Sequence, residues 1–292
     1  MSLILHSYFE RTLFLRPVFL LRLASFFVLM GRGWQFIRWD APLRTLFRDQ
    51  YLMEPVVKYL TGRDWQTYAT NLHIDQAILY IEYGIGGFFI FTAIASLIIE
   101  HRHAWLHYAL YTASGLLFLS TLLYWKEQAF SIGRLLELTI QWTTPLFLVL
   151  YVQKEGVSER LLFFMKVAVA ATFVGHGLYA FGYYPVPGSF VQMMITVFGV
   201  DENVSMTLLK IAGILDFALS AGIFLPWRSI VTISLGYAFG WGLVTALARI
   251  ISHFYRAIPL HSIEQWGHET VFRLPHALIP LIILIIVSSR KN

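Results

Sequence analysis

Two ionisable side chains lie within one apolar stretch of this sequence, 166–181, which reads KVAVAATFVGHGLYAF. A charge at the centre of a bilayer costs about 2.5–3.5 kcal/mol on insertion scales, so such residues are functional-site candidates by default. Lys166 begins the stretch, and its long side chain can reach the membrane surface. His176 lies deeper, between two glycines, and its imidazole can donate a hydrogen bond or relay a proton.

Acidic, basic and amide side chains fall within several other apolar segments. Asp216 lies near the middle of segment 207–225, where its short side chain reaches water at neither end. It must therefore face other helices, and there it is either protonated or paired. The remaining candidates belong to the other segments and are Glu82, Arg32, Gln141, Glu269, Arg273 and His276.

These groups have two possible roles. In the first, they form a polar pocket that opens toward the non-cytoplasmic side of the membrane. His176 and Arg273 then donate hydrogen bonds to the carbonyl oxygens of a ligand. Asp216 or Glu82 accepts or relays a proton. The binding site is completed by Arg32, Gln141, Glu269 and His276. In the second role, the same groups form a buried hydrogen-bond network that only holds helices together.

Histidines are frequent in the links on the predicted outer side, among them His73, His253, His261 and His268. Imidazole and carboxylate groups bind zinc, iron or copper, so a metal-dependent membrane enzyme is one alternative. No H-E-x-x-H pair occurs among these histidines, and the chain has no G-x-S-x-G, Walker or dinucleotide motif. We therefore expect no metal site.

The composition places these groups in a membrane protein. Of the 292 residues, 57% are hydrophobic and only 13% are charged, and the mean hydropathy is +0.63. A soluble domain has about 25% charged residues. Cysteine is absent, so disulfides and thiolate chemistry are excluded. The net charge of +5 matches basic residues that flank membrane spans and contact lipid headgroups, and we expect no nucleic-acid partner.

The fold expected from these numbers is all-α and polytopic. A bilayer core of about 30 Å needs about 20 apolar residues per helix. Segments that meet this requirement are about 14–37, 77–99, 105–124, 134–151, 161–182, 207–225, 229–250 and 270–288. Prolines 145, 275 and 280 fall inside these segments, where kinks are tolerated.

The two halves of the chain resemble each other. RLASFFVLMGRGWQF, at 22–36, aligns with KVAVAATFVGHGLYA, at 166–180, and YGIGGFF, at 83–89, aligns with AGILDFA, at 212–218. These matches predict two tandem four-helix repeats, 1–155 and 156–292. With four spans each, the repeats share one membrane orientation.

The distribution of basic residues predicts which side faces the cytoplasm. An even number of spans places both termini on one side, together with Arg102, Lys154, Arg160, Arg228, Arg290 and Lys291. The positive-inside rule makes that side cytoplasmic. The opposite link, 38–76, also contains basic residues, which weakens the asymmetry.

The stretches LRLASFFVLMGRGWQF and MKVAVAATFVGHGLYAFGYYPVPGSF resemble the first helix of the DoxX/DoxD-like membrane family. The resemblance implies one four-helix bundle per unit. It also implies a bacterial inner-membrane protein of the kind found in thiosulfate–quinone oxidoreductases or beside periplasmic redox enzymes. Distantly related proteins are secretory cargo receptors. This chain differs by having two units and by having Arg32 in place of the histidine of the first unit.

The leading hypothesis is a membrane subunit of a quinone-linked redox complex, whose pocket binds a quinone-like or lipid headgroup. A protein partner on the non-cytoplasmic side then supplies the electron-transfer cofactor. The alternative is a non-enzymatic scaffold, or a cargo or lipid receptor, that acts through links 38–76 and 183–206. Stretch 43–60 mixes bases and apolar residues as an interfacial helix does.

Overall fold

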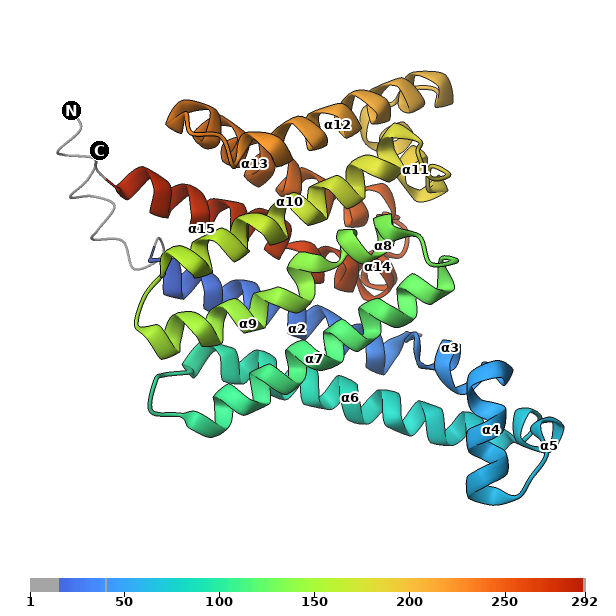
Figure 1. The fold of residues 1–292 in the computed structure, drawn as a ribbon. Coiled ribbons are helices and arrows are strands. Elements are labelled where there is room, and N and C mark those ends of the chain that lie inside the picture. The colour runs from blue at the N-terminus through green and yellow to red at the C-terminus, as the bar shows by residue number, and fades with distance from the viewer. Residues whose placement is uncertain (1–15, 40, 291–292) are drawn as a thin grey trace.

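The computed structural model describes residues 16–39 and 41–290, which form helices joined by turns and links and contain no strand (Figure 1). The first half contains α2 (Pro17–Arg38), α3 (Leu43–Phe47), α4 (Gln50–Thr61), α5 (Trp65–Ala69), α6 (Leu72–Ile98), α7 (Ala104–Glu127), α8 (Ile132–Glu137) and α9 (Thr139–Lys154). The second half contains α10 (Glu159–Phe181), α11 (Gly188–Phe198), α12 (Glu202–Gly222), α13 (Arg228–Ser252), α14 (Pro259–Arg273) and α15 (Pro275–Ser289).

Eight helical spans in the described residues are long and apolar enough to cross a membrane, which confirms the all-α polytopic fold. The fourth and eighth spans each consist of two helices, α8 with α9 and α14 with α15. The eighth span begins at Pro259, well before the predicted residue 270, because α14 is polar enough to escape a hydropathy criterion. Residues 14, 15 and 291 of the predictions lie outside the described residues.

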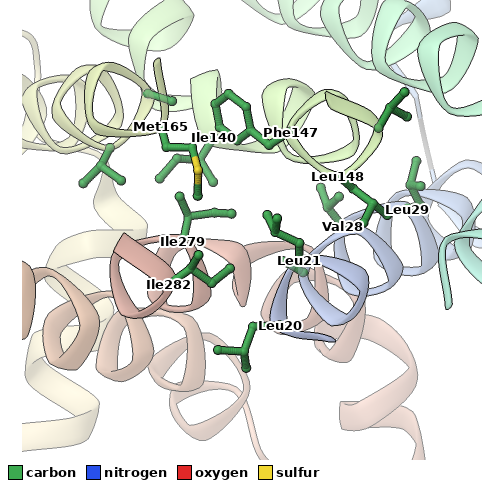
Figure 2. Close-up of a cluster of buried hydrophobic side chains, with 14 of the residues drawn as sticks. Leu20, Leu21, Val28, Leu29, Ile140, Phe147, Leu148, Met165, Ile279 and Ile282 are labelled. Atoms are coloured by element: carbon green, nitrogen blue, oxygen red, sulfur yellow. The ribbon is translucent and has the colours of Figure 1, made fainter. Parts of the chain in front are cut away.

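Four helices form the centre of the molecule, namely α2, α9, α10 and α15. Figure 2 shows their buried side chains, which include Leu20, Leu21, Val28, Leu29, Ile140, Phe147, Leu148, Met165, Ile279 and Ile282. Helices α6 and α7 pack on one side of this centre, and α12 and α13 pack on the other (Figure 1). In lipid, such packing and interhelical hydrogen bonds hold helices together, because apolar side chains gain little by leaving the lipid.

Glycines allow the closest helix approaches, and the contacts recur in the two halves. A Cβ atom on Gly33 of α2 would lie 2.9 Å from the carbonyl oxygen of Gly86 in α6. A Cβ atom on Gly213 of α12 would lie 3.0 Å from the carbonyl oxygen of Gly177 in α10. Gly86 therefore corresponds to Gly213, whereas the sequence alignment pairs Gly84 with Gly213.

A second pair of glycine contacts joins one half to the other. A Cβ atom on Gly31 of α2 would lie 2.6 Å from the Phe272 backbone nitrogen in α14. A Cβ atom on Gly175 of α10 would lie 2.4 Å from the Glu137 backbone nitrogen in α8. The division at residue 155 stays a prediction, but these contacts fix which positions correspond in the two halves.

The links between the first and second spans of each half differ. Stretch 43–60 is not one interfacial helix, because the Asp49 side chain caps the start of α4 and separates it from α3. Helices α4 and α5 project beyond the end of the bundle, whereas α11 packs against α12 and α13 (Figure 1). Both links lie at the bundle end opposite the start of α2 and the end of α15. Which side is cytoplasmic stays a prediction.

Candidate functional site

A cavity of about 90 Å³ lies in the second half, between α10, α11, α12, α13 and the α14–α15 span. It is large enough for several waters or a small headgroup. The apolar lining residues include Phe173, Ala180, Leu209, Ala212, Trp241 and Val244. The polar lining residues are His176, Asp216, Thr245, Arg249, Arg273 and His276.

Helix α11 forms one wall of this cavity with a single face. Its lining residues recur at helical spacing and are Phe190, Met193, Met194, Val197 and Phe198. The helix begins after Pro187 and ends at Gly199, whose left-handed backbone (φ 66°) suits glycine. The chain therefore returns directly into α12, and α11 stays over the cavity.

Three helices contribute to the cavity lining residues that have a buried polar atom without a hydrogen-bond partner. Among the described residues, Asp216 Oδ1, Arg249 Nε and His276 Nε2 have no hydrogen-bond partner. Their side chains belong to α12, α13 and α15 and line the same space. A buried polar group without a partner costs about 1–3 kcal/mol, and a charged one costs more. A ligand that paired these atoms would recover that energy.

The tautomer of His276 follows from its backbone contact. Its Nδ1 atom lies 2.8 Å from the carbonyl oxygen of Arg273. A carbonyl oxygen only accepts, so Nδ1 carries the proton and donates it. In a neutral ring Nε2 is then an acceptor, and it suits a ligand hydroxyl.

Two carboxylates pair with three guanidinium groups around the cavity. Arg273 contacts Glu269 at 2.9 Å, and Arg249 contacts the same carboxylate oxygen at 3.6 Å. Glu137 contacts Arg134 at 2.9 Å and lies 3.7 Å from His176 Nδ1. Glu269 is therefore shared by two arginines that line the cavity.

The corresponding region of the first half is filled. Arg32 Nε donates to Gln141 Oε1 at 3.0 Å, and Arg32 also bonds to Gln35 and Tyr124. The Phe272 ring lies 4.0 Å from the Arg32 guanidinium, within cation–π distance.

Two phenyl rings of the first half occupy positions that match cavity-lining residues of the second half. Phe36 and Phe89 are fully buried, and their ring centroids are 5.4 Å apart. Each follows a matched glycine by three residues, so Phe36 corresponds to Ala180 and Phe89 to Asp216. The first half therefore has two aromatic rings where the second half has a small side chain and an acid.

The structure separates the predicted site residues into groups. His176, Asp216, Arg273 and His276 line the cavity, and Glu269 pairs with Arg273 beside it. Arg32 and Gln141 hydrogen-bond to each other in the first half and lie outside the cavity lining. Glu82 is buried in α6, outside the cavity lining, at the position that matches Leu209.

Sequence reasoning missed Arg249 and the role of α11. Arg249 falls at the predicted end of segment 229–250, where basic residues usually flank a span. The apolar pair Ile250–Ile251 was the available signal that α13 continues, and the helix does extend to Ser252. Helix α11 is too short to span a membrane. No pattern in its sequence indicates that it packs over a cavity.

Within the described residues, no three His, Asp or Glu side chains come together in a way that could hold a metal ion. Of the histidines predicted on the outer side, His253 stacks on Trp266 with ring centroids 3.7 Å apart. The cavity is therefore the strongest candidate for ligand binding in the described part of the chain.

Comparison of the chain with protein-family models, curated proteins and solved structures finds no match. The function must therefore be argued from the site itself.

Proposed function

We propose that this integral membrane protein binds the polar head of a lipid-soluble molecule, quinone-like or a lipid headgroup, in the cavity beside α11. The observation that supports this most directly is that Asp216, Arg249 and His276 line one cavity and that each has a buried polar atom without a hydrogen-bond partner. Buried polar groups that only hold helices together are usually hydrogen-bonded.

The position of the cavity supports entry from the lipid. Phe198 of α11 and Val244 of α13 both line it and are about half exposed on the outside of the bundle. A molecule dissolved in the bilayer can therefore reach the cavity between these helices. Its apolar part would remain beside Phe198 and Val244.

The polar residues suit the recognition of such a head. His176 and Arg273 donate hydrogen bonds to its oxygens, and His276 Nε2 accepts one. Asp216 lines the cavity, so we assign proton exchange to Asp216 rather than to Glu82. The resemblance to DoxX-like proteins favours a membrane subunit of a quinone-linked redox complex, with a protein partner on the non-cytoplasmic side that holds the electron-transfer cofactor.

Native mass spectrometry of the mildly solubilised protein tests this proposal. We expect a bound amphiphile that is lost in Ala180→Phe, since Phe36 shows that a phenyl ring fits at the matching position. Ala218→Phe is the matched control, because Ala218 is exposed on α12. An amphiphile retained equally in both variants would show that it binds elsewhere and would overturn the proposal.

A second candidate function is a scaffold or receptor, favoured by the surface of α4. Tyr51, Tyr59 and Leu60 are 89%, 88% and 71% exposed on this projecting helix. Tyrosine is common at interfaces, where it provides contact area together with a polar group. Deletion of α4 should then abolish binding of a protein partner while the cavity retains its ligand. A partner that still binds after the deletion would contradict this function.

A further inference from the structure

We propose that the ligand is an acidic lipid, whose phosphate or carboxylate head is bound by Arg249 and Arg273. This inference rests on the proposed function and deepens it, because it selects an oxyanion over the neutral head of a quinone.

The charges around the cavity do not balance without such a group. Glu137 is paired with Arg134, which leaves Glu269 as the only carboxylate among the described residues that contacts Arg249 and Arg273. Asp216 lines the same cavity but forms no ion pair within the described residues. A buried guanidinium without a counter-charge is costly, so one positive charge at this end of the cavity needs an anion.

The hydrogen-bonding capacity of Arg249 is also incomplete. Its Nη1 atom lies 3.6 Å from Glu269, which is longer than a hydrogen bond, and its Nε atom has no partner in the described chain. A guanidinium fork matches the two oxygens of a phosphate or carboxylate. A quinone carbonyl could accept one of these hydrogen bonds, but it would leave the charge uncompensated.

The acceptor atom of His276 adds a second requirement for the head of the ligand. Because Nδ1 donates to the Arg273 carbonyl, Nε2 can accept the hydroxyl proton of a singly protonated phosphate. One head of this kind would provide oxygens for the arginines and a hydroxyl for the histidine.

The apolar walls distinguish an acidic lipid from a free anion. The Phe190 ring centroid lies 5.6 Å from the Arg249 guanidinium, and α11 adds Met193 and Met194 beside it. These side chains restrict water and provide contact area for a hydrocarbon tail. Free phosphate would gain nothing from them and would remain better solvated in water.

The test uses the full chain reconstituted in phosphatidylcholine nanodiscs that contain a small fraction of phosphatidic acid. Native mass spectrometry should show one retained phosphatidic acid per chain and no retained phosphatidylcholine. Arg249→Gln should weaken retention at least about tenfold, because it removes a charged hydrogen-bond donor from the head group. Arg160→Gln is the matched control. It also removes one positive charge, but from an exposed residue in the first turn of α10, so this variant should retain the lipid.

A second variant covers the case in which Arg249→Gln does not fold. Thr245→Glu places a carboxylate one turn before Arg249 on α13 and within the cavity lining. This carboxylate would supply the missing negative charge, so the variant should fold and lose phosphatidic acid.

Parallel samples with a short-chain quinone or with inorganic phosphate separate the possible failures. One outcome is that the quinone binds and is lost in Ala180→Phe, whereas phosphatidic acid does not bind in this way. That outcome would overturn this inference and leave the proposed function standing. Phosphate bound without any lipid would overturn the lipid assignment. If no probe is sensitive to Ala180→Phe, the proposed function fails as well.

Discussion

The two halves of the molecule share a scaffold but differ in what fills it. In both, the first and second spans meet at paired glycines, and the first and fourth spans form the centre. Phe36 and Phe89 pack together in the first half, whereas Ala180 and Asp216 line a cavity in the second. Two residue differences on one scaffold, together with the position of α11, therefore distinguish a packed core from a candidate site.

The polar residues show the same contrast. Arg32 has neutral partners in Gln141, Gln35 and Tyr124, and it serves as a satisfied structural group. Arg249, Asp216 and His276 each have an atom without a partner. Residues at functional sites commonly reduce stability, and this difference predicts opposite mutational effects in the two halves.

The largest effect should come from opening the filled half. Phe89→Ala removes a fully buried ring and should cost about 3–5 kcal/mol of unfolding free energy, the usual range for a phenylalanine truncated in a core. Denaturant unfolding in detergent measures this loss. Phe91→Ala is the control, because Phe91 is partly exposed on the same helix. Equal losses from both would mean that the first half is not tightly filled.

A smaller loss should follow from separating the two halves. Gly175→Ala places a Cβ atom 2.4 Å from the Glu137 backbone nitrogen, which must move. We expect a cost of about 1–3 kcal/mol, as for other overpacked cores. Gly31→Ala should behave alike, since its Cβ atom would meet the Phe272 backbone. Gly115→Ala, with nothing within 4 Å, should be neutral or stabilising; a loss there would contradict the steric explanation.

A gain in stability is expected when the second half is made more like the first. Asp216→Leu removes a buried acid with an unpaired oxygen and should raise the unfolding free energy by about 0.5–2 kcal/mol, while ligand binding is lost. Thermal unfolding with and without added lipid reports both effects. A destabilised Asp216→Leu protein would show that the acid holds helices together.

The smallest effect concerns the projecting link of the first half. The hydrogen bond from Lys126 lowers the pKa of the Asp49 carboxyl below its usual value of about 3.9. The contact therefore stabilises the folded state fully at pH values above the usual pKa. This stabilisation is lost as the pH falls through the lower pKa of the folded state.

A spin label on Tyr59→Cys, the only cysteine in such a chain, measures this effect. The label should become more mobile at acidic pH as α4 loosens. In Asp49→Asn the mobility should no longer respond to acid. An unchanged acid response in that variant would assign the effect to another group.

Much of the membrane architecture was predictable because it depends on local composition. All eight spans overlap predicted segments, since each must satisfy its own backbone hydrogen bonds in lipid. Of the three prolines at which kinks were expected, Pro275 follows the break at Leu274, whereas Pro145 and Pro280 lie within continuous helices. The break at Leu138 was not predicted, because no proline or glycine marks it.

Part of the candidate site was also predictable. Burial of a charge in lipid is costly wherever it occurs, so His176, Asp216, Arg273 and His276 could be singled out from hydropathy alone. The same criterion selected Arg32, Gln141 and Glu82, because it does not distinguish a polar group that lines a cavity from one buried elsewhere. It missed Arg249, whose position near a span end resembles that of a flanking residue.

The sequence by itself thus determined the membrane environment, the helical spans and the set of buried polar residues, because these depend on the solvation of each segment. Only the tertiary structure decided which polar residues meet and which space remains open. Those outcomes depend on contacts between residues distant in the chain, such as Phe36 with Phe89 and Arg249 with Glu269. No local pattern encodes the volume left between six helices, and that volume distinguishes a binding cavity from a packed core.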